Sequence, residues 1–70
     1  GYGVDVIADR EKHEGAWVRL TCEKDCRFRE VSSNWHGLTG MMAGDEIYGK
    51  FEVIWLDRGE IWAYRCRESA

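Results

Sequence analysis

Two segments of the chain place apolar side chains and then a cysteine at every second position, and this pattern constrains the fold more than any other feature. In residues 16–22, one face of an extended strand would carry Val18, Leu20 and Cys22. In residues 60–66, one face would carry Trp62, Tyr64 and Cys66. Such alternation is typical of half-buried β-strands, so the sequence predicts two strands that each end in a cysteine.

Other segments also have strand patterns and are separated by glycine or by charged residues. Strands are expected within residues 4–8, 26–31 and 51–56, and turns at residues 23–25 and 57–59. Residues 9–15 and 37–49 are expected to be mainly loop. Five or six short strands joined by glycine-containing turns favour an antiparallel all-β fold, either a sandwich or a small barrel.

The composition limits both the size of the fold and the kinds of partner. With 70 residues the chain forms one small domain, residues 1–70, and a core of this size usually needs an additional constraint. The net charge is −3 and the two signs are interspersed, which argues against nucleic acid as a partner. No apolar stretch approaches the length of a membrane span.

Trp35 lies between the two cysteine-bearing segments, and the whole pattern resembles an immunoglobulin-like domain. The resemblance implies a small antiparallel β-sandwich in which Cys22 and Cys66 are bridged across Trp35. It also implies that Val18, Leu20, Trp35 and Tyr64 lie in the hydrophobic core.

More narrowly, residues 4–22 and the stretch from Asp57 to Cys66 resemble the gamma and delta accessory chains of the T-cell receptor complex. That resemblance implies a non-catalytic module on the extracellular side of the plasma membrane, with no cofactor and no small-molecule substrate. The module would heterodimerise with an epsilon-type chain beside the antigen-receptor chains. The sequence departs from the family pattern: no proline follows Asp57, three extra residues separate Gly59 from Tyr64, and Cys26 is an additional thiol.

Only four residues follow Cys66, which implies a domain that lacks its last strand. We would then expect the edge of the strand holding Trp62 and Tyr64 to be open to a partner chain. A membrane association would come only from segments beyond this sequence.

The cysteine pairing is left open by the residues themselves. A Cys22–Cys66 bridge would contribute roughly 4 kcal/mol by reducing the entropy of the unfolded chain, against about 2 kcal/mol for a Cys22–Cys26 bridge. The short bridge with Cys66 free, and three reduced thiols, are the alternatives. A zinc site of Cys22, Cys26, His36 and Cys66 is a further, weaker alternative, so we expect no metal.

A catalytic interpretation has little support. Ser32, Ser33, His36 and Asp45 are of the right types for a nucleophile, a base and an orienting group, but no spacing links them. We therefore expect no catalytic residues and no enzymatic activity.

The chain has more large aromatic side chains than 70 residues easily bury. A partner surface is expected to include Tyr48, Phe51, Trp55 and Trp62. Two other classes of binding protein share these features: a small secreted disulfide-stapled effector or toxin of a pathogen, and an intracellular, phage-type small-barrel interaction module.

Overall fold

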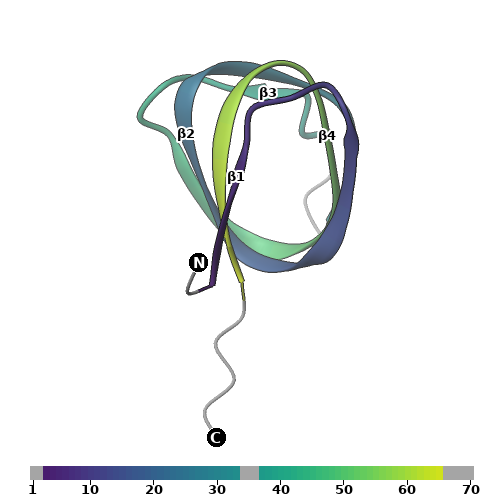
Figure 1. The fold of residues 1–70 in the computed structure, drawn as a ribbon. Coiled ribbons are helices and arrows are strands. Elements are labelled where there is room, and N and C mark those ends of the chain that lie inside the picture. Colours follow the sequence, from purple (N-terminus) through teal and green to yellow (C-terminus); the bar gives the residue numbers. More distant parts are fainter. Residues whose placement is uncertain (1–2, 34–36, 66–70) are drawn as a thin grey trace, which may run out of the picture.

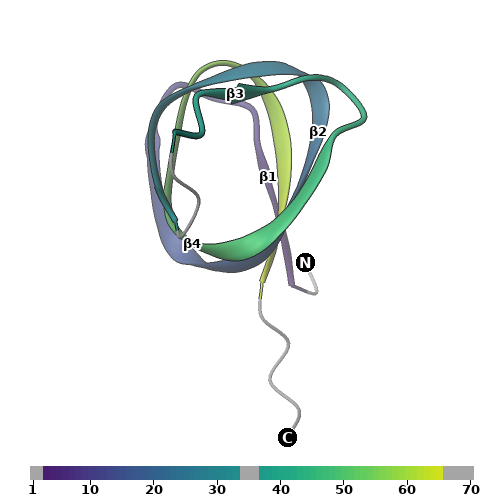
Figure 2. The same cartoon turned by 180° about the vertical axis from the view of Figure 1, so that it is seen from behind.

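The computed structural model describes residues 3–33 and 37–65, which form an antiparallel all-β fold, as predicted. The strands are β1 (Val4–Ile7), β2 (Lys12–Ser33), β3 (Gly40–Met41) and β4 (Glu46–Arg65). They form one sheet in the order β1-β4-β2-β3, with all neighbours antiparallel. Figure 1 and the reverse view in Figure 2 show β2 and β4 wrapped around the same interior. Within the described residues, no helix is long and apolar enough to cross a membrane.

β2 and β4 pair with each other along both edges, and this closes the sheet on itself. Arg19 of β2 has Tyr48 as its partner on one side and Tyr64 on the other. The other residues paired on both sides are Trp17, Leu20 and Thr21 in β2, and Phe51, Val53, Ile54 and Trp55 in β4. A strand residue has one neighbour on each side, so β4 must return to β2 after passing around the interior. The described strands thus form one closed sheet, and a two-layer immunoglobulin-like sandwich is not confirmed.

The edge that was expected to be open is occupied by β1. Val4 pairs with Tyr64 and Val6 pairs with Trp62, while β2 holds the opposite edge of the same part of β4. The prediction of an unpaired edge at Trp62 and Tyr64 is therefore wrong, because β1, from the start of the chain, pairs with this part of β4.

The segments predicted as turns at residues 23–25 and 57–59 are corners within continuous strands. β2 and β4 both bend here and stay paired, with Lys24 opposite Glu60 and Arg27 opposite Arg58. The pairing register shifts on each side of Lys24, which is how an antiparallel ribbon takes up a sharp bend. This corner brings the two halves of each long strand to opposite sides of the interior.

The core fills the closed sheet and draws on every strand. Its buried side chains are Ile7, Trp17, Leu20, Cys22, Cys26, Phe28, Met41, Phe51, Ile54, Leu56, Ile61 and Ala63. Leu20 lies in this core, but Val18 is 36% exposed, so its predicted core position is wrong. The register shifts on both sides of Trp17 break the alternation and allow Trp17 and Leu20 to face inward together.

Cys22 carries a free thiol, so the predicted bridge to Cys66 is not formed. The Cys22 Sγ donates to the backbone oxygen of Lys24 at 2.9 Å and to that of Met41 at 3.6 Å. The Cys22 and Cys26 thiols are 3.9 Å apart and not bonded, so the short bridge is not formed either. Trp35 and Cys66 lie outside the described residues, and so does the predicted packing of Trp35.

Asp5 ties β1 to both long strands. Its Oδ2 accepts a hydrogen bond from the Trp17 indole Nε1 at 2.8 Å and another from the Arg65 Nε at 2.7 Å. The hydrogen bond from Arg65, and then that from Trp17, hold the pKa of the Asp5 carboxyl below its usual value. A carboxyl whose pKa is lower in the folded state stabilises the fold above its unfolded-state pKa. That stabilisation is lost as the pH falls through the folded-state pKa.

We therefore expect Asp5→Ala to lower the free energy of unfolding by about 1 kcal/mol at pH 7, since one partly exposed ion pair and one hydrogen bond are removed. Urea denaturation at pH 7, and again below the folded-state pKa of Asp5, measures the effect. The difference from wild type should shrink at the acid pH. Glu52→Ala, which removes an exposed carboxylate from β4, is the matched control. An equal loss at both pH values would contradict the assigned role of the Asp5 charge.

Candidate functional site

The outer surface of the closed sheet carries a cation held between two tyrosine rings. Arg19 lies between the two passes of β4, with Tyr48 on one side and Tyr64 on the other. Its guanidinium carbon is 5.9 Å from the Tyr48 ring centroid and 4.4 Å from the Tyr64 ring centroid. Both distances are within the range of cation–π attraction. The three side chains come together only because β4 meets β2 on both edges.

Glu46 fixes the position of the Arg19 side chain. The Arg19 Nε donates to the Glu46 Oε2 at 2.6 Å, and Glu46 is the neighbour of Thr21 one row further along the sheet. A guanidinium that is bonded to a carboxylate and lies within cation–π distance of two rings has already lost part of its side-chain entropy before a partner binds. The Arg19 side chain is therefore partly preorganised before any partner arrives.

Trp62 extends this surface by one row. It is the partner of Thr21 in β2 and of Val6 in β1, and its indole Nε1 donates to the Glu60 Oε2 at 3.0 Å. Trp62 is 36% exposed, Tyr48 is 62% exposed and Val6 is 55% exposed. We call the four residues Arg19, Tyr48, Trp62 and Tyr64 the aromatic platform. It is a patch of aromatic rings around one guanidinium that is ion-paired with Glu46.

The residues predicted for a partner surface are distributed differently in the structure. Tyr48 and Trp62 lie on the platform. The prediction for Phe51 is wrong, because its side chain is 1% exposed and lies in the core. Trp55 is half-buried away from these two, with Arg29 over its ring at 4.9 Å and its Nε1 donating to the Arg10 oxygen at 2.9 Å. Tyr64, predicted for the core, is half-buried and faces Arg19 on the outer side.

Arg19 is the site residue that the sequence did not reveal. Its alternation with Leu20 places it on the face opposite the core, so an exposed arginine was the natural interpretation. Its two tyrosine neighbours come from positions 48 and 64, far along the chain. Pairing of one residue with two distant partners has no signature in local periodicity.

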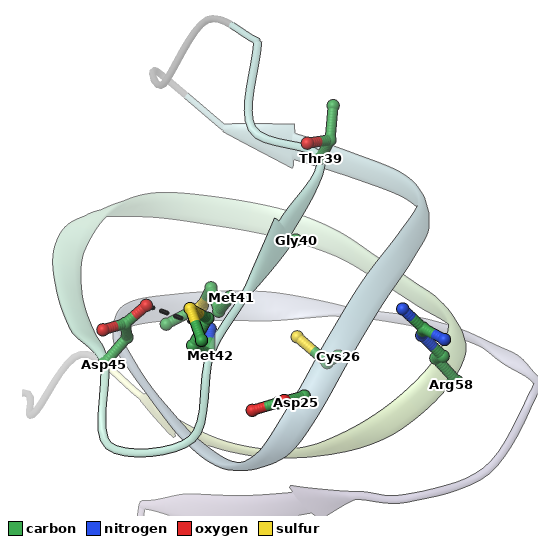
Figure 3. Close-up of a pocket in the computed structure, with 8 residues that line it drawn as sticks. All are labelled: Asp25, Cys26, Thr39, Gly40, Met41, Met42, Asp45 and Arg58. Atoms are coloured by element: carbon green, nitrogen blue, oxygen red, sulfur yellow. Dashed lines mark hydrogen bonds between the residues drawn. The ribbon is translucent and has the colours of Figure 1, made fainter.

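A second feature is the thiol pair, Cys22 and Cys26, at the corner of β2. Burial raises the pKa of the Cys22 thiol, and burial raises the pKa of the Cys26 thiol to about 12. Both thiols are therefore protonated at neutral pH and are poor nucleophiles. Cys26 also lines a pocket of about 280 Å³ together with Met41 and Met42 (Figure 3).

The other residues considered for chemistry are not assembled within the described part of the chain. Among those residues, no group of three or more His, Cys, Asp or Glu side chains could hold a metal ion. His36 and Cys66 of the zinc alternative lie outside the described residues. Ser32 is exposed on β2 opposite Val53, and Asp45 lies in the turn before β4, where it accepts a hydrogen bond from the Met42 backbone N–H at 3.0 Å.

Comparison with protein-family models finds no match to this chain, and neither the curated proteins nor the solved structures yield a match. The function is therefore inferred from the site geometry alone.

Proposed function

We propose that the chain is a small non-catalytic β-barrel module that binds another protein through the aromatic platform. The observation that carries the proposal is the side chain of Arg19, ordered between Tyr48 and Tyr64 and bonded to Glu46. Arginine, tyrosine and tryptophan are the residues most enriched among those that dominate binding energy at protein interfaces. Here they lie next to one another on regular strands.

The platform has the properties of a surface that gains free energy when covered. Tyr48 is mainly exposed and Trp62 is about one-third exposed, and the sheet beneath them is closed and paired on both sides. Covering such rings removes apolar area from water at a small cost in side-chain entropy. Arg19 is ion-paired with Glu46, and the guanidinium N–H donors that Glu46 does not engage select partners with a carbonyl or carboxylate oxygen in the matching place.

The narrower function remains a prediction of the sequence: an immunoglobulin-like receptor accessory chain outside the plasma membrane, paired with an epsilon-type chain. Its main support was a Cys22–Cys66 bridge across Trp35, and the Cys22 thiol is free. Of the alternatives, the intracellular small-barrel interaction module agrees best with the closed sheet and with the two free thiols. We therefore favour a protein-binding small barrel.

Selection from a displayed library of peptides and small domains would test this proposal. Ligands selected on the wild-type chain should bind Tyr48→Ala or Trp62→Ala about 30-fold or more weakly, since loss of a dominant interface residue costs about 2 kcal/mol or more. An epsilon-type accessory-chain ectodomain is added to the library as one defined partner. Enrichment of that ectodomain through the platform would support the narrower prediction.

The matched control is Met42→Ser, which alters an exposed apolar side chain in the turn before β4. It should leave the affinity of the selected ligands unchanged. Ligands that bind the platform variants as well as wild type, or that depend on Met42 instead, would contradict the proposed binding face.

A further inference from the structure

The thiol pair lies in a place where the chain is held from several sides. The Cys22 backbone N–H donates to the Asp45 oxygen at 2.9 Å, and the Gly44 N–H donates to the Cys22 oxygen at 2.8 Å. Cys26 pairs with Met41 of β3. The corner of β2 and the turn before β4 are therefore joined by backbone hydrogen bonds, and the two thiols are positioned before any ligand binds.

Two acidic side chains hold the same turn in place. The Asp25 Oδ1 accepts a hydrogen bond from the Ala43 N–H at 2.7 Å, and the Asp45 Oδ2 accepts one from the Met42 N–H at 3.0 Å. Both carboxylates line the pocket that Cys26 shares with Met41 and Met42, and Arg58 lies across it (Figure 3). The pocket thus combines sulfur atoms from three residues with two negative charges and one positive charge.

The two thiols are in hydrogen-bond contact at 3.9 Å, and this spacing also accommodates two sulfur ligands around one ion. A disulfide requires about 2.05 Å between the sulfurs. A thiolate–metal bond is about 2.3 Å long, so two sulfurs that share an ion are at most about 4.6 Å apart. The 3.9 Å that separates Cys22 from Cys26 falls between these limits. Thiolate and thioether ligands select soft cations, above all Cu(I).

We propose that Cys22 and Cys26 form a binding site for a single Cu(I) ion, reached through the pocket lined by Met41 and Met42. Binding breaks two S–H bonds and forms two Cu–S bonds, and the two protons pass to the buffer. No electron is transferred, so the reaction needs no oxidant or reductant. The thioether of Met41 is a neutral soft donor beside the pair that strengthens binding of the ion without adding charge, and the thioether of Met42 lines the pocket through which the ion enters.

The test uses the chain with Cys66→Ser, so that Cys22 and Cys26 are its only thiols. Cu(I) is supplied without oxygen from a bicinchoninate complex, and transfer is followed by the loss of that complex's colour and by thiolate-to-copper absorption in the ultraviolet. We expect one ion per chain. We also expect the melting temperature to rise by roughly 10 °C or more when free Cu(I) is about 100 times Kd.

Two variants make the result specific. Cys26→Ser should abolish the transfer, and Met41→Leu, which conserves volume, should keep the fold and weaken binding several-fold. A folded chain that takes no Cu(I) from bicinchoninate would overturn the proposal. Equal uptake by Cys26→Ser would also overturn it, and so would uptake with a lowered melting temperature, because the ion would then bind the unfolded chain.

A parallel titration of the wild-type chain with Zn(II) tests the zinc alternative. Tight Zn(II) binding that requires His36 and Cys66 would replace the proposed copper site with a four-ligand zinc site.

Discussion

Gly59→Ala is expected to be among the most damaging single substitutions in the chain, lowering the free energy of unfolding by roughly 2–5 kcal/mol. Gly59 lies at the corner of β4 with a φ of +97°, a conformation that costs an L-residue about 1–2 kcal/mol. A Cβ at this position would overlap the Cα of Cys26 and lie 2.5 Å from the Asp25 backbone oxygen. Relieving that overlap requires the two strands to separate, which adds about 1–3 kcal/mol.

The size of this effect is comparable to the whole stability of a chain of this length, about 4–10 kcal/mol. Gly44→Ala is the matched control, because Gly44 has a φ of +93° and a methyl group there would meet nothing within 4 Å beyond its chain neighbours. Gly44→Ala should lower the free energy of unfolding only by the cost of placing an L-residue at a positive φ. Urea denaturation of both variants measures the difference, and equal losses would show that the corner is not as tightly closed as described.

Phe51→Ala is expected to lower the free energy of unfolding by about 3–5 kcal/mol, the usual cost of removing a buried aromatic ring. Phe51 is enclosed by the sheet and pairs with Trp17 on one edge and Ser33 on the other. The ring therefore lies where both passes of β2 meet β4. Thermal or urea denaturation followed by tryptophan fluorescence measures the loss.

Tyr48→Ala is the comparison for this variant, three positions earlier in the same strand. Both residues belong to the partner surface expected from the sequence, whereas the structure places Tyr48 outside and Phe51 inside. We expect Tyr48→Ala to cost less than about 1 kcal/mol, because the side chain is mainly exposed. Similar losses for the two variants would contradict the arrangement of β4.

The strand content was predictable because it depends on local patterns. The alternation in residues 16–22 and 60–66 has the strand period whatever the strand pairs with, and residues 4–8 include all of β1. Which face of each strand points into the core was not predictable from these local patterns. In residues 61–64 both faces are apolar, and the sequence predicted Tyr64 for the core although it predicted Trp62, on the same face, for a partner surface. The interior instead takes Ile61 and Ala63, because the closed sheet leaves limited space inside.

The site could not be predicted because it depends on closure. Arg19, Tyr48 and Tyr64 are neighbours only through two separate ladders between the same pair of strands. The charged segment at residues 23–25 has the composition of a turn, and composition does not distinguish a turn that ends a strand from a corner that bends it. For the same reason, the sequence could not show that Cys22 and Cys26 meet at a bend.

The most direct test of the closed sheet is the set of interstrand nuclear Overhauser effects at Arg19, measured by NMR on the isotope-labelled chain. The platform exists only if β4 flanks β2 on both sides at this residue. We expect backbone contacts from Arg19 to Tyr48 and to Tyr64 in the same folded species, with Leu20 showing the corresponding pair to Ile47 and Ala63. Contacts from Arg19 to only one of the two tyrosines would contradict the closed sheet, and with it the proposed binding face.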